Sequence, residues 1–193
     1  MVVDEKKENG IEIYTMSSMA TLKGFIKNGF DTSTIINIIV SFDSEFGEFQ
    51  KKGFSFPPNL FFYHEVSWSE TIGVLINHPK FTKEEAVTAL KKLIIKFNLQ
   101  RIVKFNSDEL LENLVEEANQ RVVQKFNNPR LKIGVHDIII IGGFLREKIN
   151  FVHSGDEGFL KTCEELGINT VPLPQRDFEK EKEIKSWMKK GRS

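Results

Sequence analysis

The sequence of 193 residues has only one cysteine, Cys163, and no excess of either charge: 27 lysine and arginine residues balance 27 aspartate and glutamate residues. A single cysteine excludes an internal disulfide and fits a reducing compartment. Balanced charge excludes a global field that would steer the whole chain to nucleic acid, although a local basic patch remains compatible with it. Composition alone therefore indicates no class of partner.

Long apolar runs are also missing, and no segment reaches the length that a membrane-spanning helix requires. The first ten residues, MVVDEKKENG, are charged where a signal peptide would be apolar. Hydrophobic residues make up 40% of the chain, which is enough for one well-packed domain. We expect a soluble cytoplasmic protein with no membrane association.

Two common cofactor motifs are absent. No pair of histidines has the spacing of a zinc motif, so we assign no zinc. The four histidines are His64, His78, His136 and His153. The Gly142-Gly143 pair belongs to no Gly-x-Gly-x-x-Gly or Walker loop, which argues against a dinucleotide site. These two glycines instead favour close packing of a helix against a sheet.

Strand and helix patterns alternate along the chain. Strands are expected at 25–31, 59–67, 101–105, 150–153 and 169–173. Helices are expected at 33–42, from 67 or 69 to 76, from 82 to 97, from 106 to 126, through the isoleucine run after 136, and at 157–166. Thr82 with Glu85, and Asn106 with Glu109, have the spacing of capping pairs. This alternation predicts an α/β sandwich with a central, mostly parallel sheet.

Four acidic residues follow the expected strands. Asp31 closes the first strand, and Glu70 comes soon after the second. Asp137 starts the isoleucine helix, and Asp156 follows the strand at 150–153. Parallel strands end at one edge of a sheet, where ligands bind, so the four carboxylates are expected together. Taken alone, each aspartate is more often a helix cap, which stabilises a helix by roughly 0.5–2 kcal/mol.

Carboxylates gathered at one edge repel one another and raise one another's pKa values. Hard divalent cations such as Mg²⁺ or Mn²⁺ relieve this repulsion and select oxygen ligands, so the group is a candidate metal site. Sites that hold two metals between carboxylates support in-line displacement at phosphorus and need no nucleophile from the protein. Phosphodiester hydrolysis is therefore the reaction class that we expect.

Four short motifs, in order, resemble those of PIN-domain ribonucleases. The segment at 30–36 (FDTSTII) resembles the opening Asp-Thr-Ser/Asn motif. The segment at 66–71 (VSWSET) is similar to the second motif, a glutamate after the second strand, and 136–140 (HDIII) is similar to the third. The segment at 151–159 (FVHSGDEGF), with Gly167-Ile168 after it, resembles the closing motif. Each motif is weak alone, but their ordered combination is fairly specific.

The resemblance implies a three-layer PIN-like sandwich with an endoribonuclease site for single-stranded or structured RNA. It implies that Mg²⁺ or Mn²⁺ is held by Asp31, Glu70, Asp137 and Asp156, with Ser33 and Ser154 hydrogen-bonding an acid or the bound water. Both VapC-type toxins and RNA-processing proteins have this domain, and for a toxin an antitoxin protein would lie across the site. Glu65 is a competitor for the role of Glu70.

The domain is expected at 25–174, with an N-terminal extension at 1–24 and a charged tail at 175–193. The chain is longer than compact VapC-type toxins, and part of the excess is an inserted helical pair at 82–126. The apolar stripes of this pair pack either on their own sheet or, in a homo-oligomer, on a second copy of the chain.

Two other functions compete with the nuclease. A haloacid-dehalogenase-like phosphatase needs Asp-x-Asp after the first strand, where this chain has Asp31-Thr32-Ser33. A non-catalytic PIN-like module that binds RNA or a protein is the alternative from another class. Such a module has little use for four carboxylates that repel one another, so the acids favour catalysis.

Overall fold

A computed structural model describes residues 25–40, 59–77 and 81–173. The expected N-terminal extension at 1–24 and the charged tail at 175–193 lie outside these residues. None of the helices in the described part of the chain is long and apolar enough to cross a bilayer.

Five strands in the described ranges form one parallel sheet. They are β1 (Ile26–Phe30), β2 (Asn59–His64), β3 (Gln100–Ile102), β4 (Phe151–Ser154) and β5 (Asn169–Pro172). Their order is β3-β2-β1-β4-β5, and every neighbouring pair is parallel. The central strand is β1, and the strand order switches sides between β1 and β4. The predicted α/β fold class is confirmed, and this switch point is where ligands bind in such sheets.

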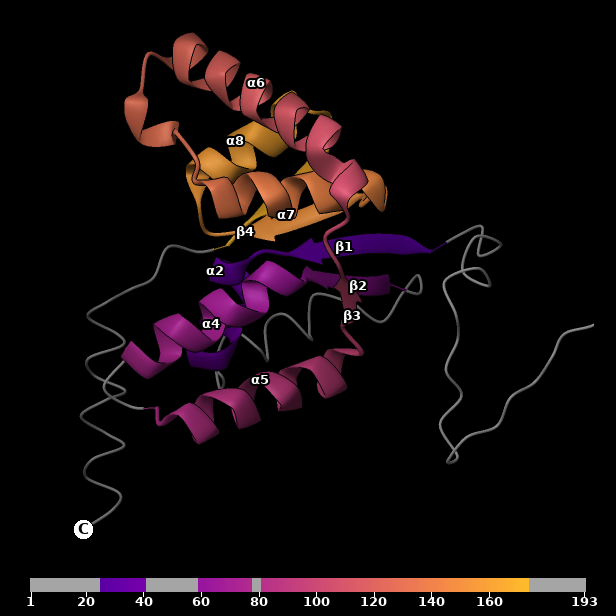
Figure 1. Cartoon of the computed structure of the whole chain (residues 1–193), viewed down its shortest axis with the longest axis vertical. Coiled ribbons are helices and arrows are strands. Elements are labelled where there is room, and N and C mark those ends of the chain that lie inside the picture. Colours follow the sequence, from indigo (N-terminus) through magenta and orange to yellow (C-terminus); the bar gives the residue numbers. More distant parts are fainter. Residues whose placement is uncertain (1–24, 41–58, 78–80, 174–193) are drawn as a thin grey trace, which may run out of the picture.

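Helices cover both faces of the sheet (Figure 1). The helices α2 (Thr32–Val40), α4 (Glu65–Asn77) and α5 (Lys83–Phe97) lie on one face, and α6 (Glu109–Phe126), α7 (Val135–Arg146) and α8 (Glu157–Glu165) lie on the other. The result is a sandwich of three layers.

The core divides between the two faces because side chains alternate along each strand. On β2, Phe61 and Tyr63 join the cluster formed with α2, α4 and α5, whereas Phe62 joins the cluster formed with α6, α7 and α8. The isoleucine run supplies the second cluster with Ile140 and Ile141, both fully buried. This run therefore anchors α7 in the core, as its apolar character predicts.

The helices expected as an inserted pair at 82–126 are part of the sandwich itself. The strand β3 lies between α5 and α6 in the sequence, and the two helices cover opposite faces (Figure 1). Leu90 of α5 belongs to one core cluster and Val115 of α6 to the other. Their apolar stripes thus pack on their own sheet, which is the first of the two expected alternatives.

Several expected boundaries are wrong. The strand expected at 101–105 is β3 at Gln100–Ile102, and the helix expected from 106 begins at Glu109 after a 3-10 turn. The strand predicted at 59–67 ends at His64, and α4 begins at Glu65 rather than at 67 or 69. The backbone N–H of Val66 donates to Nδ1 of His64 at 3.2 Å, and this contact accompanies the turn from strand to helix. The aromatic and β-branched composition of the segment, which predicts a longer strand, contains no sign of that contact.

One of the two predicted capping pairs is present. Thr82 accepts a hydrogen bond from the Glu85 N–H at 3.2 Å, and Glu85 accepts one from the Thr82 N–H at 2.8 Å, so α5 has a full capping box. The predicted pair of Asn106 and Glu109 does not form. Instead, residues 106–108 form a 3-10 turn in which Asp108 accepts from the Phe105 N–H at 2.9 Å.

Close packing of α7 on the sheet depends on Gly143. A Cβ atom at this position would lie 2.7 Å from Cδ2 of His64 and 3.1 Å from Cγ2 of Ile102. Only glycine permits this approach, so the expected role of this residue is confirmed. Its neighbour Gly142 faces α6 instead, where a Cβ atom would lie 3.3 Å from Cγ of Glu112.

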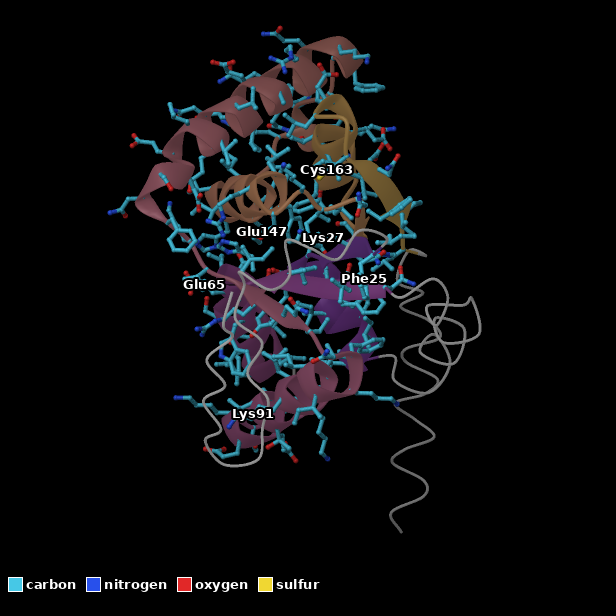
Figure 2. The ribbon with its side chains drawn as sticks, turned by 90° about the vertical axis from the view of Figure 1, so that its right-hand side faces the viewer. Phe25, Lys27, Glu65, Lys91, Glu147 and Cys163 are labelled. Carbon is cyan, nitrogen blue, oxygen red and sulfur yellow. The ribbon has the colours of Figure 1, made fainter. Side chains whose placement is uncertain are left out.

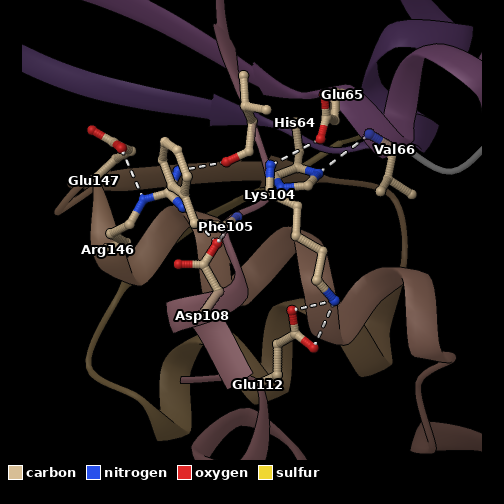
Figure 3. A network of polar contacts seen from close by, with 10 residues as sticks. His64, Glu65, Val66, Lys104, Phe105, Asp108, Glu112, Arg146 and Glu147 are labelled. Carbon is tan, nitrogen blue, oxygen red and sulfur yellow. Dashed lines mark hydrogen bonds and ion pairs between the residues drawn. The ribbon is translucent and has the colours of Figure 1, made fainter. Parts of the chain in front are cut away.

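Polar contacts fasten the other end of α7 to the segment after β3 (Figure 3). Arg146 donates to Oδ2 of Asp108 at 2.5 Å and to the Val103 carbonyl at 2.8 Å, and its guanidinium lies over the Phe105 ring. Lys104 forms an ion pair with Glu112 of α6 at 2.8 Å. These contacts fix α7 at its C-terminus, while Gly143 fixes its distance from the sheet.

Candidate active site at the carboxyl edge of the sheet

The four sequence-predicted acids lie at the edge where the parallel strands end. Asp31 follows β1 directly, and Asp156 lies two residues after β4. Glu70 lies in the second turn of α4, the helix that follows β2. Asp137 was expected to start its helix but lies in the first turn of α7, which begins at Val135.

Asp31 is the most buried of the four acids, with 4% of its surface exposed. Its carboxylate accepts hydrogen bonds from the Thr34 N–H at 2.7 Å, from Ser33 Oγ at 2.9 and 3.0 Å, and from Ser154 Oγ at 2.6 Å. Burial raises the pKa of Asp31, and these hydrogen bonds act in the opposite direction. Asp31 therefore caps the start of α2 and also belongs to the acidic edge.

Ser33 and Ser154, predicted to hydrogen-bond an acid, tie Asp31 to the turn that carries Asp156. Besides donating to Asp31, Ser33 Oγ accepts from the Gly155 N–H at 2.8 Å. Ser154 Oγ likewise accepts from the Asp156 N–H at 2.9 Å. The two serines thus hold the ends of β1 and β4 in one hydrogen-bonded unit.

Glu70 is held by two side chains that sequence reasoning did not assign to it. Its carboxylate accepts from Thr32 Oγ1 at 2.6 Å and lies 2.6 Å from Nδ1 of His136. Thr32 starts α2 and His136 is in the first turn of α7, so Glu70 joins three helices at this edge. The only sequence signal for Thr32 and His136 is that each stands next to a predicted acid, Asp31 or Asp137.

The pKa of Asp137 depends on its burial and on the other three acids. Burial raises this pKa first, and Asp156, Glu70 and Asp31 raise it further. A hydrogen bond from the Gly134 N–H, 3.1 Å long, lowers it, and the net result is a pKa of about 6. The repulsion expected from the sequence thus acts on Asp137 in this structure.

Asp156 is exposed and caps α8, because its Oδ1 accepts from the Phe159 N–H at 2.8 Å. Glu65, the competitor for the role of Glu70, forms its hydrogen bond with the segment after β3 and not with Thr32 or His136. Its Oε1 accepts from the Lys104 N–H at 2.9 Å (Figure 3).

A buried asparagine positions the loop that leads into α7. Nδ2 of Asn119 donates to the Leu131 carbonyl and to Thr162 Oγ1, both at 2.9 Å, and Oδ1 accepts from the Ile133 N–H at 3.3 Å. These bonds join α6, α8 and the segment before Gly134. Asn119 was not predicted as part of the site, and its role depends on partners 12 to 43 residues away.

The four acidic side chains are chemically suitable ligands for a hard divalent cation. All four groups are carboxylates, and carboxylate oxygens are the ligands that Mg²⁺ and Mn²⁺ select. Within the described residues, however, no three histidine, cysteine or acidic side chains stand in an arrangement ready to hold a metal ion. The carboxylates instead accept hydrogen bonds from their own chain, so metal binding requires side-chain adjustment.

The lone cysteine does not compete as a nucleophile. Cys163 is fully buried among α8 and its neighbours (Figure 2), and burial raises the pKa of its thiol. A neutral buried thiol is unreactive, so Cys163 is not a candidate nucleophile.

The five-stranded parallel sheet between two layers of helices has the PIN-like architecture that the sequence motifs predicted. Comparison with solved structures shows which proteins have a similar fold. The match to a chain of VapBC2 from Rickettsia felis, in a complex with a DNA fragment from the VapBC2 promoter, has a TM-score of 0.57 and a sequence identity of 13%, and it covers 77% of this chain and 100% of that chain. A chain of VapBC-1 from nontypeable Haemophilus influenzae has a TM-score of 0.53 at 14% identity, covering 76% and 98%.

A chain of DNA-bound VapBC from Salmonella typhimurium has a TM-score of 0.50 at 14% identity, again covering 76% and 98%. No protein-family model matches the sequence, and no curated protein is a significant match. Identities this low show a shared fold. The chain thus has the fold of the VapC-type PIN domains.

Proposed function

We propose that this protein is a metal-dependent endoribonuclease that hydrolyses phosphodiester bonds of single-stranded or structured RNA. The observation that carries the proposal is the placement of Asp31, Glu70, Asp137 and Asp156 at the carboxyl edge of the sheet. Carboxylates gathered at one edge lower stability, because like charges repel, and they are useful where a cation binds. The likeness to chains of VapBC assemblies supports a nuclease of the PIN class.

In this proposal, Asp31, Glu70, Asp137 and Asp156 would hold Mg²⁺ or Mn²⁺. Bound there, the metal would polarise a phosphoryl oxygen and activate water for in-line attack. Ser33 and Ser154 keep Asp31 oriented, since they donate to it from two different elements. His136 and Thr32 orient Glu70 in the same way.

Cleavage of a mixed single-stranded RNA pool by the full chain, with Mn²⁺ or with EDTA, tests the proposal. The informative variant is Asp137→Asn, because an asparagine oxygen can still accept from the Gly134 N–H and keep the start of α7. We expect a loss of at least about 100-fold, the size found when one group that stabilises a transition state is removed. Glu116→Gln, an exposed acid on α6, serves as the control and should cut normally.

Cutting by Asp137→Asn at the rate of the control, or cutting in EDTA, would contradict the assignment. Failure of the wild type to cut RNA or to bind Mn²⁺ in calorimetry would favour the alternative, a non-catalytic module that binds RNA or protein.

A protein partner belongs to the same proposal, because the similar chains come from VapBC assemblies, two of them DNA-bound. We propose that an antitoxin-like protein covers the acidic edge and that the chain forms a homo-oligomer. Light scattering after size-exclusion chromatography tests the second point, since the monomer has a mass of 22.2 kDa. A monomer at all concentrations would refute it.

A further inference from the structure

An open pocket lies at the carboxyl edge beside β3, along the start of α4, the helix that also carries Glu70. Its volume is about 430 Å³, within the range of small-ligand sites. The lining side chains come from three elements: Tyr63 of β2, Arg101 of β3, and Glu65, Val66, Trp68 and Ser69 of α4. Tyr63 and Arg101 are partners in the parallel register, so both point to the same face of the sheet.

The helix α4 connects this pocket with the acidic edge. Trp68 precedes Glu70 by two residues, which is about 200° around a helix, so the two side chains leave nearly opposite flanks of α4. The width of a helix with its side chains is about 10–12 Å, and this sets the scale of the separation. The start of α4 thus lines the pocket, and its second turn carries Glu70.

The pocket combines a fixed aromatic ring with an available cation. Trp68 is half-buried and packs against the core cluster of α2, α4 and α5 while it lines the pocket. Arg101 is exposed and makes no salt bridge with any described residue. Its charge reaches the Tyr63 hydroxyl, whose pKa burial raises and Arg101 lowers. Aromatic rings stack on bases, and arginine pairs with phosphate.

Glu65 adds a selective acceptor to the pocket. Its Oε1 accepts from the Lys104 N–H, which fixes the carboxylate (Figure 3). No described residue donates to its Oε2, so that oxygen is free to accept from a ligand. A carboxylate accepts from the exocyclic amine of a base such as cytosine, and uracil has no such amine.

We propose that this pocket binds an unpaired nucleobase of the RNA close to the bond that is cut. Trp68 stacks on the base, Arg101 binds the adjoining phosphate, and Glu65 accepts a hydrogen bond from the exocyclic amine. The proposal rests on RNA being the substrate and names the subsite that selects its sequence. A nucleotide matches both charges of the pocket, since it carries an anion and an amine donor. A purely acidic peptide would instead meet repulsion from Glu65.

Fluorescence of Trp68 offers a test that does not depend on catalysis. The chain has two tryptophans, so Trp187→Phe leaves Trp68 as the only source of tryptophan emission. The probes are the dinucleotides CpC and UpU in EDTA, because they are short enough to fill the pocket without crossing the acids. We expect CpC to quench Trp68 and to bind more tightly than UpU.

Two further substitutions in that background locate the contact. Arg101→Gln should weaken the binding of CpC at least fivefold, a change in binding free energy of about 1 kcal/mol. Glu65→Gln should remove the preference for CpC over UpU. Lys91→Gln is the matched loss of one positive charge, on the exposed surface of α5 well away from Glu65 (Figure 2), and should change CpC binding less than about twofold.

Each contrary result overturns the proposal. Absence of quenching by CpC would do so, as would equal effects of Arg101→Gln and Lys91→Gln. Stronger quenching by a tetraglutamate peptide than by CpC would assign the pocket to an acidic protein partner instead. If the protein cleaves RNA but the pocket shows none of these effects, the proposed function holds and the subsite is refuted. If CpC binds in the pocket but no RNA is cleaved, the pocket binds a nucleotide and the proposed function is refuted.

Discussion

The packing of α7 predicts that one methyl group at position 143 is enough to disturb both stability and the acid site. The change Gly143→Ala would place Cβ 2.7 Å from Cδ2 of His64 and 3.1 Å from Cγ2 of Ile102. Neither neighbour yields easily, because His64 is fully buried and its ring accepts from the Val66 N–H. The helix must therefore move outward from the sheet, and Asp137 moves with it.

The change in the free energy of unfolding of Gly143→Ala is the sum of two opposing effects. Overpacking a tight core costs about 1–3 kcal/mol, whereas alanine in a helix interior is favoured over glycine by about 1 kcal/mol. Gly73→Ala isolates the second effect, since Gly73 lies inside α4 and a Cβ atom there would meet nothing within 4 Å. We expect Gly73→Ala to stabilise the protein and Gly143→Ala to be less stable than Gly73→Ala by about 1–3 kcal/mol.

Urea unfolding of the two variants and the wild type measures this difference. With a slope of about 2 kcal/mol/M, the two midpoints should differ by about 1 M. RNA cleavage should fall in Gly143→Ala but not in Gly73→Ala, because only the first change displaces the helix of Asp137. Equal midpoints for the two alanine variants would refute the packing argument.

Three further predictions follow from the buried polar groups. Burial lowers the pKa of His64 from 6.5 to about 4, so protonation opposes folding, and up to about 3 kcal/mol of stability is present above pH 6.5 and lost as the pH falls to 4. His64→Gln should therefore flatten the dependence of unfolding free energy on pH in that window, and an unchanged slope would be evidence against it. Asn119→Ala should cost about 2–3 kcal/mol in urea unfolding, because it leaves the Leu131 carbonyl and the Ile133 N–H without their partner; a loss below about 0.5 kcal/mol would show that the loop finds other partners. Asp156→Asn should unfold within about 1 kcal/mol of the wild type, because asparagine also caps helices, yet it should lose cleavage; a variant that still cuts would remove Asp156 from the site.

Local signals account for the parts of the fold that were predicted correctly. The capping box of Thr82 and Glu85 needs only neighbouring residues, and the isoleucine run identifies a buried helix by composition. The end of β2 at His64 was missed because the contact that accompanies the turn, from the Val66 N–H to the His64 ring, has no signal in the composition of the segment. The capping pair at Asn106 failed because Asp108 takes its place, and Arg146, 38 residues further on, holds Asp108 there.

In the candidate site, too, one part was predictable from the sequence and another was not. The order of the acids along the chain is enough to place them at one edge, because parallel strands end together. The contacts that hold the acids in position are not readable from the sequence. Thr32 and His136 reach Glu70 across 38 and 66 residues, and Asn119 reaches Thr162 across 43. No local pattern specifies such pairs, since they exist only once the layers have packed.

Capping and metal binding, which the sequence presents as alternatives for Asp31, Asp137 and Asp156, do not exclude each other. Each of the three aspartates accepts backbone N–H bonds at the start of a helix: the Thr34, Gly134 and Phe159 N–H groups are the donors. In Asp156 the cap occupies Oδ1 and leaves Oδ2 for another partner. Helix starts also carry partial positive charge, which offsets part of the repulsion among the acids. The fold can therefore gather four carboxylates at one edge because the same side chains that crowd there also begin its helices.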